Sequence, residues 1–302
     1  MAKPLGDDRH AKLALALLFI AGITIGFSGI LVRLSEVGPM ASAFWRMAFA
    51  FPVLATWHLL ERRKRVADPA GTIYPRAWSA GLVIAGLLYA IELSIWHWSL
   101  EWTSVANATV IANIYPVVVT LGAWILFRER ANRLFLVGLA TAVAGMAVLV
   151  GDKFTLGLSS LKGDILSAVT AIFYGGYFMV VARMRTRRST AEIMTWSAIV
   201  ASIVLLPVAL VMSDSIFPAT PGGWAALVAL AVLCQAGAQG AITFALAHLP
   251  ASLSAVTLLI QPLTAAIMAW LILGEPIGPF QVVGGAILLA GIFIARRGSM
   301  RR

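Results

Sequence analysis

Cysteine and charge are scarce in this chain. Its one cysteine, Cys234, lies in an apolar stretch, which excludes an intrachain disulfide framework and a metal site built from thiolates. Asp, Glu, Lys and Arg make up 12% of the 302 residues, against about 25% in an average soluble domain. The sequence contains neither GxxxxGKS nor GxxxxGKT, so we expect no loop for direct use of ATP.

Catalytic and metal-binding patterns are also missing. The His and carboxylate residues lack the spacing of a metal site, and no Ser or Cys nucleophile has an evident base. We therefore expect a protein that is not an enzyme and that uses no cofactor or metal.

Apolar residues, by contrast, are abundant. They make up 60% of the chain, and the mean hydropathy is +0.90, which is typical of an integral membrane protein. Ten apolar segments each approach the ~20 residues that cross a hydrocarbon core. They cover 12–34, 40–60, 77–99, 103–127, 133–151, 163–183, 191–212, 222–246, 251–273 and 279–296. The first segment is too long, and too closely followed by the second, for a cleaved signal peptide.

The distribution of positive charge predicts how these segments are oriented. With both termini in the cytoplasm, the outer side holds only Arg33, Lys153 and Lys162 of the 23 Lys and Arg residues, and Arg46 lies within a span. This asymmetry follows the positive-inside rule. Topology and contacts with anionic lipid then account for the net charge of +10, so we expect no nucleic-acid partner.

The second half of the chain repeats the first. Matched residues recur at one constant spacing: Pro116 and Pro262, Trp124 and Trp270, Glu129 and Glu275, Gly138 and Gly284, Gly145 and Gly291. Five spans per half is an odd number, so the halves, 1–152 and 153–302, must have opposite orientations. We predict an all-α integral membrane fold of ten transmembrane helices, in two inverted five-helix repeats around a central cavity. This architecture is typical of carriers that work by alternating access.

Paired motifs in the two halves carry a family resemblance: Pro116…Trp124…Glu129, Pro262…Trp270…Gly274-Glu275-Pro276, and a glycine-rich last helix in each half. The whole chain resembles the drug/metabolite transporter (DMT) superfamily. Within it, the chain looks most like the EamA-type bacterial metabolite exporters, which include aromatic amino acid exporters of the YddG type. One departure is that Arg130, rather than proline, follows Glu129. The resemblance implies a transporter of the bacterial inner membrane.

Polar side chains within the spans are candidates for the transport path, because lipid offers them no hydrogen-bond partner. In the third span, Tyr89, Glu92 and Trp96 share one helical face. Glu92 is expected in the outer half of the membrane, where it either couples transport to protons or binds a substrate ammonium group. The alternative is a carboxylate tied to a neighbouring helix.

The fourth and ninth spans carry matched prolines. Pro116 and Pro262 have no N–H to donate, which predicts kinks along a water-filled path. Asn107 and Tyr115 share one stripe of the fourth span. Tyr115 and Gln261 hold the same position in the two repeats, and we expect them to face each other across the midplane. The alternative is that the prolines only shape helix packing.

Two further spans each have a single polar stripe. Tyr174 and Tyr177 form the stripe of the sixth span, and Gln235 and Gln239 form that of the eighth. We expect these side chains to line the cavity, with hydrogen bonding between helices as the competing role. Arg46 is interpreted mainly as a cation that snorkels to the outer interface, and less favourably as the partner of a substrate carboxylate.

Glycines predict hinges and close helix contacts. Gly26 and Gly176 hold corresponding positions in the two halves and are candidate hinges. The glycine faces of the fifth and tenth spans allow close contact between helices. Such faces would permit a homodimer as well as a monomer.

The polar groups within the spans limit the substrate. Phosphorylated solutes need several deep Lys or Arg residues, and only Arg46 qualifies. We predict a secondary transporter that exports small metabolites, most favourably amino acids (aromatic or otherwise neutral), by alternating access. Efflux of drugs or other amphipathic solutes is the alternative. A facilitative channel is less favoured because a continuous polar lining is not evident. Proton antiport and facilitated diffusion both stay open.

Overall fold

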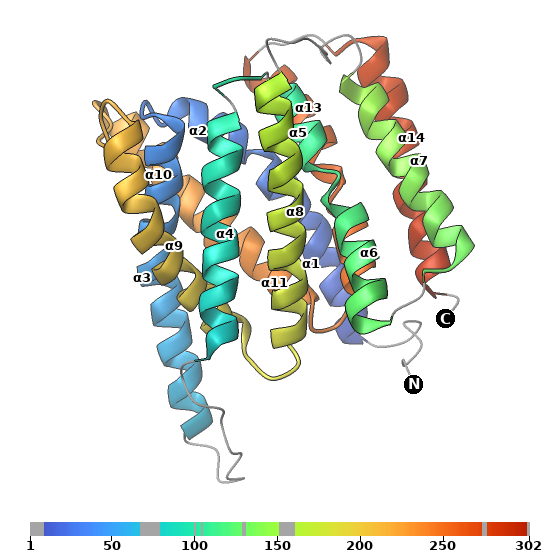
Figure 1. The fold of residues 1–302 in the computed structure, drawn as a ribbon, viewed down its shortest axis with the longest axis horizontal. Coiled ribbons are helices and arrows are strands. Elements are labelled where there is room, and N and C mark those ends of the chain that lie inside the picture. Colours follow the sequence, from blue (N-terminus) through green and yellow to red (C-terminus); the bar gives the residue numbers. More distant parts are fainter. Residues whose placement is uncertain are drawn as a thin grey trace.

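The computed structural model describes residues 9–66, 79–99, 101–103, 105–128, 131–150, 161–273 and 277–300. All regular structure in these ranges is helical (Figure 1), which confirms the predicted all-α class. Two landmarks of the sequence repeat, Glu129 and the turn at 274–276, lie outside the described residues, as does Lys153.

The helices run up and down a single bundle. In chain order they are α1 (Arg9–Gly26), α2 (Ser28–Leu34), α3 (Pro39–Val66), α4 (Ala80–Ser99), α5 (Val105–Ala112), α6 (Tyr115–Phe127), α7 (Arg133–Val150), α8 (Leu161–Met184), α9 (Thr190–Met212), α10 (Pro221–Ala229), the π-helix η2 (Leu230–Gln239), α11 (Gly240–Ala245), α12 (Ala251–Thr257), α13 (Ile260–Leu273) and α14 (Pro279–Met300). Helix α1 begins, and α14 ends, at what we call the basal end of the bundle (Figure 1). Helix α2 and the start of α10 lie at the opposite, distal end.

Eight helical stretches in the described residues are long and apolar enough to cross a membrane. They are Arg9–Leu34, Ala80–Ser99, Ala108–Leu126, Leu161–Met184, Thr190–Met212, Pro221–Ala245, Ala251–Ile272 and Pro279–Ser299, and Arg133–Leu149 is a shorter apolar helix. Helix α3 has 28 residues but is less apolar, since it contains Arg46 and ends in the basic run 62–65.

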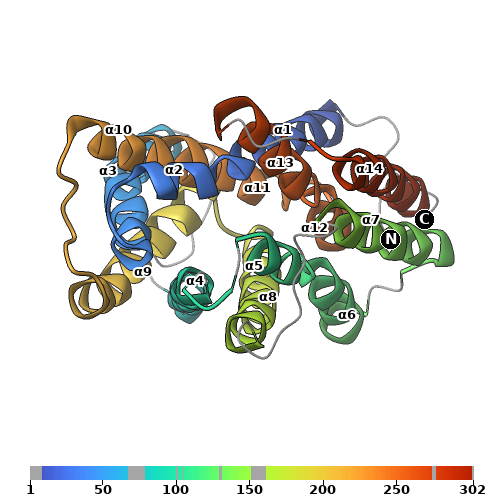
Figure 2. The same cartoon turned by 90° about the horizontal axis from the view of Figure 1, so that it is seen from above.

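Helices α7 and α14 lie side by side along the bundle (Figure 2). Their glycines make this contact a backbone-to-backbone one, because a Cβ atom on Gly145 would collide with the backbone of Leu288, and one on Gly291 with that of Ala142. The predicted close contact is therefore confirmed. This contact joins the two halves within one chain. The two glycine faces are therefore occupied by each other and are not available for contact with a second copy of the chain.

The packing pattern is unchanged when the two halves are exchanged. Helix α3 packs against α9, as α7 does against α14, and these pairs close the two ends of the assembly (Figure 2). Helix α4 packs against α8 and α9, and in the other half η2 packs against α1 and α3. Each pair thus has a counterpart at the matching position of the other half.

Two helices break at matched positions. The stretch of α5 and α6 is interrupted at Asn113–Ile114, and that of α12 and α13 at Leu258–Leu259, each shortly before a proline. In the second break the N–H of Gln261 donates to the carbonyl of Leu258 at 3.0 Å, a tighter turn that replaces the bond lost at Pro262.

The apolar stretch Pro221–Ala245 contains the π-helix η2. A π-helix widens the turn and is a frequent feature of functional sites. Both Gln235 and Gln239 lie on η2, and both side chains are buried. This wide turn directs two amides into the interior between the halves.

Candidate functional site

Four tyrosine rings form a continuous row in the interior. Tyr89 on α4 stacks on Tyr177 of α8, with ring centroids 4.6 Å apart. Tyr177 is followed by Tyr174 at 6.1 Å on the same helix, and Tyr174 meets Tyr115 of α6 edge-on at 4.6 Å. The structure therefore brings together tyrosines from three predicted polar stripes, and their rings offer one aromatic wall.

A polar network lies at one end of this row. The Nε atom of Arg46 donates to Oε1 of Gln235 at 3.0 Å, and its Nη2 donates to the hydroxyl of Tyr89 at 3.2 Å. The Tyr89 hydroxyl in turn donates to the same Gln235 oxygen at 2.8 Å. Helices α3, α4 and η2 thus meet at three mutually bonded side chains.

Arg46 does not snorkel to the outer interface, so that interpretation was wrong. The residue is only 5% exposed, because its side chain is held inward by Gln235 and Tyr89. The sequence carried one usable signal, since a lone cation within a span is a functional candidate by default. Its partners come from distant segments and could not be found from spacing.

The second half of the tyrosine row has its own polar contacts. The Tyr174 hydroxyl donates to Oε1 of Gln239 at 3.5 Å, a long bond. Tyr115 donates to the backbone carbonyl of Ala255 on α12 at 3.3 Å. The hydroxyl of Tyr115 therefore reaches the break region of the other half through its backbone rather than through Gln261.

Several buried polar atoms near this centre lack a hydrogen-bond partner among the described residues. The unpartnered donors are the Nε2 atoms of Gln235, Gln239 and Gln261, and the unpartnered acceptor is Oε2 of Glu92. Buried polar atoms are almost always hydrogen-bonded in folded proteins, so unmatched atoms of this kind indicate a place for a ligand or water.

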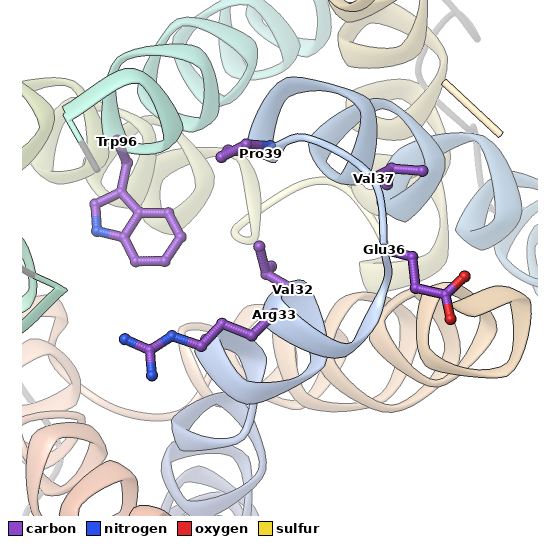
Figure 3. Close-up of a pocket in the computed structure, with 7 residues that line it drawn as sticks. Val32, Arg33, Glu36, Val37, Pro39 and Trp96 are labelled. Atoms are coloured by element: carbon purple, nitrogen blue, oxygen red, sulfur yellow. The ribbon is translucent and has the colours of Figure 1, made fainter. Parts of the chain in front are cut away.

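A pocket at the distal end lies next to α4, the helix that carries Glu92. Trp96, one helical turn beyond Glu92 on α4, lines an open pocket of about 300 Å³ together with Arg33, Glu36 and their neighbours on α2. Figure 3 shows the rings of Trp96 and the guanidinium of Arg33 on the same side, whereas Glu36 points away from them. Glu92 itself is partly exposed and within the electrostatic field of Arg46.

The rim of this pocket is tied to the second half of the chain. The Glu36 carboxylate accepts from the Thr220 hydroxyl at 2.5 Å and from the Thr220 N–H at 3.0 Å. These two hydrogen bonds hold the pKa of Glu36 below the usual value of a glutamate. Glu36 has a φ of 62°, a left-handed conformation that is uncommon outside glycine. The α2–α3 loop thus contacts the start of α10.

Towards the basal end, the turn after α8 and the helices α9 and α11 contact one another and Tyr177. The Arg185 Nε donates to the backbone carbonyl of Thr243 at 3.1 Å. The Thr243 hydroxyl lies 3.2 Å from the sulfur of Met194, and the Tyr177 hydroxyl lies 3.9 Å from the same sulfur. The pocket is open at the distal end, while packed side chains from α8, α9 and α11 lie on the basal side.

The remaining predicted residues have varied positions. Asn107 lies on α5, but its side chain falls outside the described residues. Gly26 ends α1 and lies against Thr264 of α13, leaving no room for a Cβ atom. Gly176 lies within the uninterrupted helix α8, with Leu88 as its nearest neighbour. No cluster of His, Cys, Asp and Glu that could hold a metal ion occurs in the described ranges.

Comparison with known proteins finds relatives along nearly the whole chain. A protein of Archaeoglobus fulgidus named "Uncharacterized transporter" is 31% identical over 295 residues, which cover 96% of this chain and 98% of that protein. The pseudopaline exporter CntI of Pseudomonas aeruginosa is 26% identical, across 95% and 96% of the two chains. A "Probable terminal-alkyne amino-acid exporter" of Streptantibioticus cattleyicolor is 26% identical, across 91% and 90%.

The fold has a solved counterpart. A crystal structure superimposes with a TM-score of 0.80, covering 96% of this chain and 98% of the other at 16% identity. That likeness concerns the fold alone. The model of the EamA-like transporter family matches twice, at residues 12–151 and 161–297. The chain is therefore a membrane transporter that belongs to the EamA-like transporter family, within the drug/metabolite transporter superfamily.

Proposed function

We propose that this transporter exports small metabolites, most favourably amino acids (aromatic or otherwise neutral) or similar zwitterions, by alternating access. The observation that carries the proposal is the interior site itself, in which a row of four tyrosines ends at the buried network of Arg46, Tyr89 and Gln235. An aromatic wall with a few fixed polar groups is the usual construction of a site for a small organic molecule.

The relatives support this substrate class. Two of them are named as exporters, one of pseudopaline and one of an amino acid. Among the described residues, Arg46 is the only buried arginine, and neutral amides lie near it. This suits a solute with one carboxylate better than a phosphorylated one. Aromatic side chains of the substrate would stack on Tyr174 and Tyr115, whose rings extend the wall away from Arg46.

The topology we propose has ten spans. Eight are the long apolar stretches, the ninth is the shorter apolar helix Arg133–Leu149, and the tenth is α3. The matched packing of the halves 1–152 and 153–302, and the matched breaks before Pro116 and Pro262, support two inverted repeats. Positive charge at the basal end supports a cytoplasmic location for both termini in a bacterial inner membrane.

Motion in this scheme occurs at the helix breaks. The interruptions before Pro116 and Pro262, and the end of α1 at Gly26, already lack regular helical bonding. These positions can change direction without breaking intact helical hydrogen bonds. We propose them as hinges, and we retain Gly176 as a fourth hinge that bends α8 only during transport.

Glu92 is the group that we propose for coupling to protons. Its unpartnered oxygen can hold either a proton or the ammonium group of a substrate. Competition between the two at one carboxylate would link proton entry to substrate exit. Trp96, between Glu92 and the distal pocket, then marks the path that the substrate takes outward.

Efflux of amphipathic drugs is the second candidate. The observation that favours it is the aromatic wall, which binds many flat apolar solutes regardless of their charge. A facilitative channel has less support, since the described side chains towards the basal end of the tyrosines are packed against each other. Neither of these functions requires a carboxylate on the transported solute, whereas amino acid export does.

Counterflow in proteoliposomes tests the proposal. Vesicles that contain the purified protein are preloaded with unlabelled amino acids, and the entry of labelled phenylalanine and threonine is followed. Saturable entry that is stimulated by the internal amino acid is the expected result, and it distinguishes a carrier from a channel. Entry that no internal amino acid stimulates would contradict amino acid transport and would favour drug-like substrates.

A further inference from the structure

Arg46 is a buried cation without a counter-ion. Its two described hydrogen bonds go to neutral oxygens, those of Gln235 and Tyr89, and it forms no ion pair within the described residues. Removing a guanidinium from water is costly unless an anion compensates for it. In this conformation no described carboxylate lies within ion-pair distance of Arg46.

The amide beside Arg46 also has a donor without a hydrogen-bond acceptor in the described part of the chain. Oε1 of Gln235 accepts from both Arg46 and Tyr89, and these two donors fix the orientation of the amide. Its Nε2 must then point elsewhere, and that atom is buried without a partner, as is Nε2 of Gln239. A buried N–H donor of Gln235 without an acceptor, next to a cation, indicates a site for an anion.

The form of the donors identifies the anion. A guanidinium presents parallel N–H groups that match the two oxygens of a carboxylate. Glu92 lies three residues after Tyr89 on α4, hence on the same helical face as this partner of Arg46, and has an unpartnered acceptor. As a carboxylate it would repel a simple anion and attract an ammonium group. A molecule with one carboxylate and one ammonium group satisfies both residues at once.

We propose that Arg46 binds the carboxylate of the transported zwitterion directly, that Gln235 and Tyr89 are the neutral groups that occupy Arg46 between transport cycles, and that Glu92 receives the ammonium group. The assignment rests on the proposed function, which it deepens from amino acids in general to solutes with a free carboxylate. It gives the network a second state, in which the carboxylate takes the place of the Gln235 oxygen.

The test compares three probes that share one ring: phenylalanine, phenylalaninamide and phenylethylamine. The last two lack the carboxylate. In counterflow, the wild-type protein is expected to prefer phenylalanine, and Arg46→Gln is expected to lower that preference about tenfold to a hundredfold, as for a lost hydrogen bond to a charged group. Arg183→Gln removes the same charge from the exposed last turn of α8, outside the proposed site, and should leave the preference as it is in the wild type.

A second variant keeps the test decisive if Arg46→Gln does not fold. Gln235→Glu places a carboxylate within the protein where we expect that of the substrate. Because it pairs Arg46, this variant should melt at a higher temperature than the wild type and should lose phenylalanine transport at least about tenfold. Gln239→Glu, on the same π-helix but bonded to Tyr174, should melt at a lower temperature, since its carboxylate is buried without a cation.

The outcomes separate the two claims. If the wild type transports phenylalanine but Arg46→Gln or Gln235→Glu retains its preference for phenylalanine over phenylalaninamide, the carboxylate site is wrong while amino acid export stands. If the wild type transports phenylalaninamide and phenylethylamine as fast as phenylalanine, both claims are overturned in favour of a carrier for amphipathic amines. If the wild type transports none of the three probes and no internal amino acid stimulates the entry of threonine, amino acid export fails and the carboxylate site fails with it.

Discussion

The contact between α7 and α14 and the centre between α3, α4, α8 and η2 are built in opposite ways. In the first, glycines bring two backbones together and leave no space for a side chain. In the second, buried amide donors and one carboxylate oxygen lack hydrogen-bond partners among the described residues, and the buried cation Arg46 is bonded only to neutral groups. The first region is complete in itself and its role is structural. The second has buried polar atoms left over, and for this reason we propose it as the substrate site.

The largest effect is expected from a mutation that disrupts the α7–α14 contact. Gly291→Leu places a side chain against the backbone of Ala142, which cannot move aside as a flexible side chain can. Overpacking of this kind costs about 1–3 kcal/mol or more of folding free energy. The melting temperature and the yield of monodisperse protein in detergent are the measurements, and we expect both to fall sharply.

Gly29 provides the matched control for this change. A Cβ atom there meets nothing within 4 Å, and alanine favours the helix more than glycine does. Gly29→Ala should therefore melt at or slightly above the wild-type temperature. Equal losses in Gly29→Ala and Gly291→Leu would show that the α7–α14 contact is not specially close.

A second prediction tests the proposed role of Glu92 in proton coupling. Glu92→Gln keeps the shape of the side chain but removes the proton site, so transport driven by a pH gradient should fall about 5- to 150-fold, the usual range of coupling between two ligands. Exchange of amino acids without a gradient should fall much less. Both rates are measured on the same proteoliposomes, and an equal loss of both would refute proton coupling at Glu92.

A third prediction concerns the aromatic wall. Tyr174→Ala removes a ring that contacts Tyr115 and Tyr177, and one aromatic contact contributes about 0.5–1.5 kcal/mol. The apparent affinity for phenylalanine should fall about two- to tenfold, and that for threonine should fall less. Tyr174→Phe keeps the ring and loses only the long bond to Gln239, so it should behave like the wild type. A larger loss in Tyr174→Phe would assign the role to the hydroxyl.

The smallest effect is expected at the distal rim. Hydrogen bonds from Thr220 lower the pKa of Glu36, so their contribution to stability is present at neutral pH and is lost as the pH falls through that lowered pKa. Glu36→Gln should therefore melt slightly below the wild type at neutral pH, and the difference should disappear in acid. Melting curves across this pH range are the measurement, and a difference that grows in acid would have the wrong sign.

Much of the fold could be predicted because local chemistry determines it. Apolar length gave the helical class, and Pro116 and Pro262 placed the breaks, because a missing N–H acts on its own helix. The glycine faces predicted close contacts, but sequence could not say that Gly145 and Gly291 serve a contact within the chain. That outcome depends on how the two halves pack.

The site was predicted in part for the same reason. Spacing alone put Tyr89, Tyr174 and Tyr177 on inward faces, which the structure brings together. The role of Arg46 could not be seen, since it depends on Gln235, far away in the sequence, and on the wider turn of η2. Whether these residues bind a substrate remains the prediction to be tested.

The most direct test is the thermal shift of the purified protein on addition of phenylalanine. A ligand that binds the folded state raises its melting temperature in proportion to the logarithm of its concentration above Kd. We expect phenylalanine to stabilise the wild type and Gly29→Ala, and to leave Arg46→Gln unchanged. An equal shift in Arg46→Gln and in the wild type would contradict the claim that the unmatched charge at Arg46 is the substrate site.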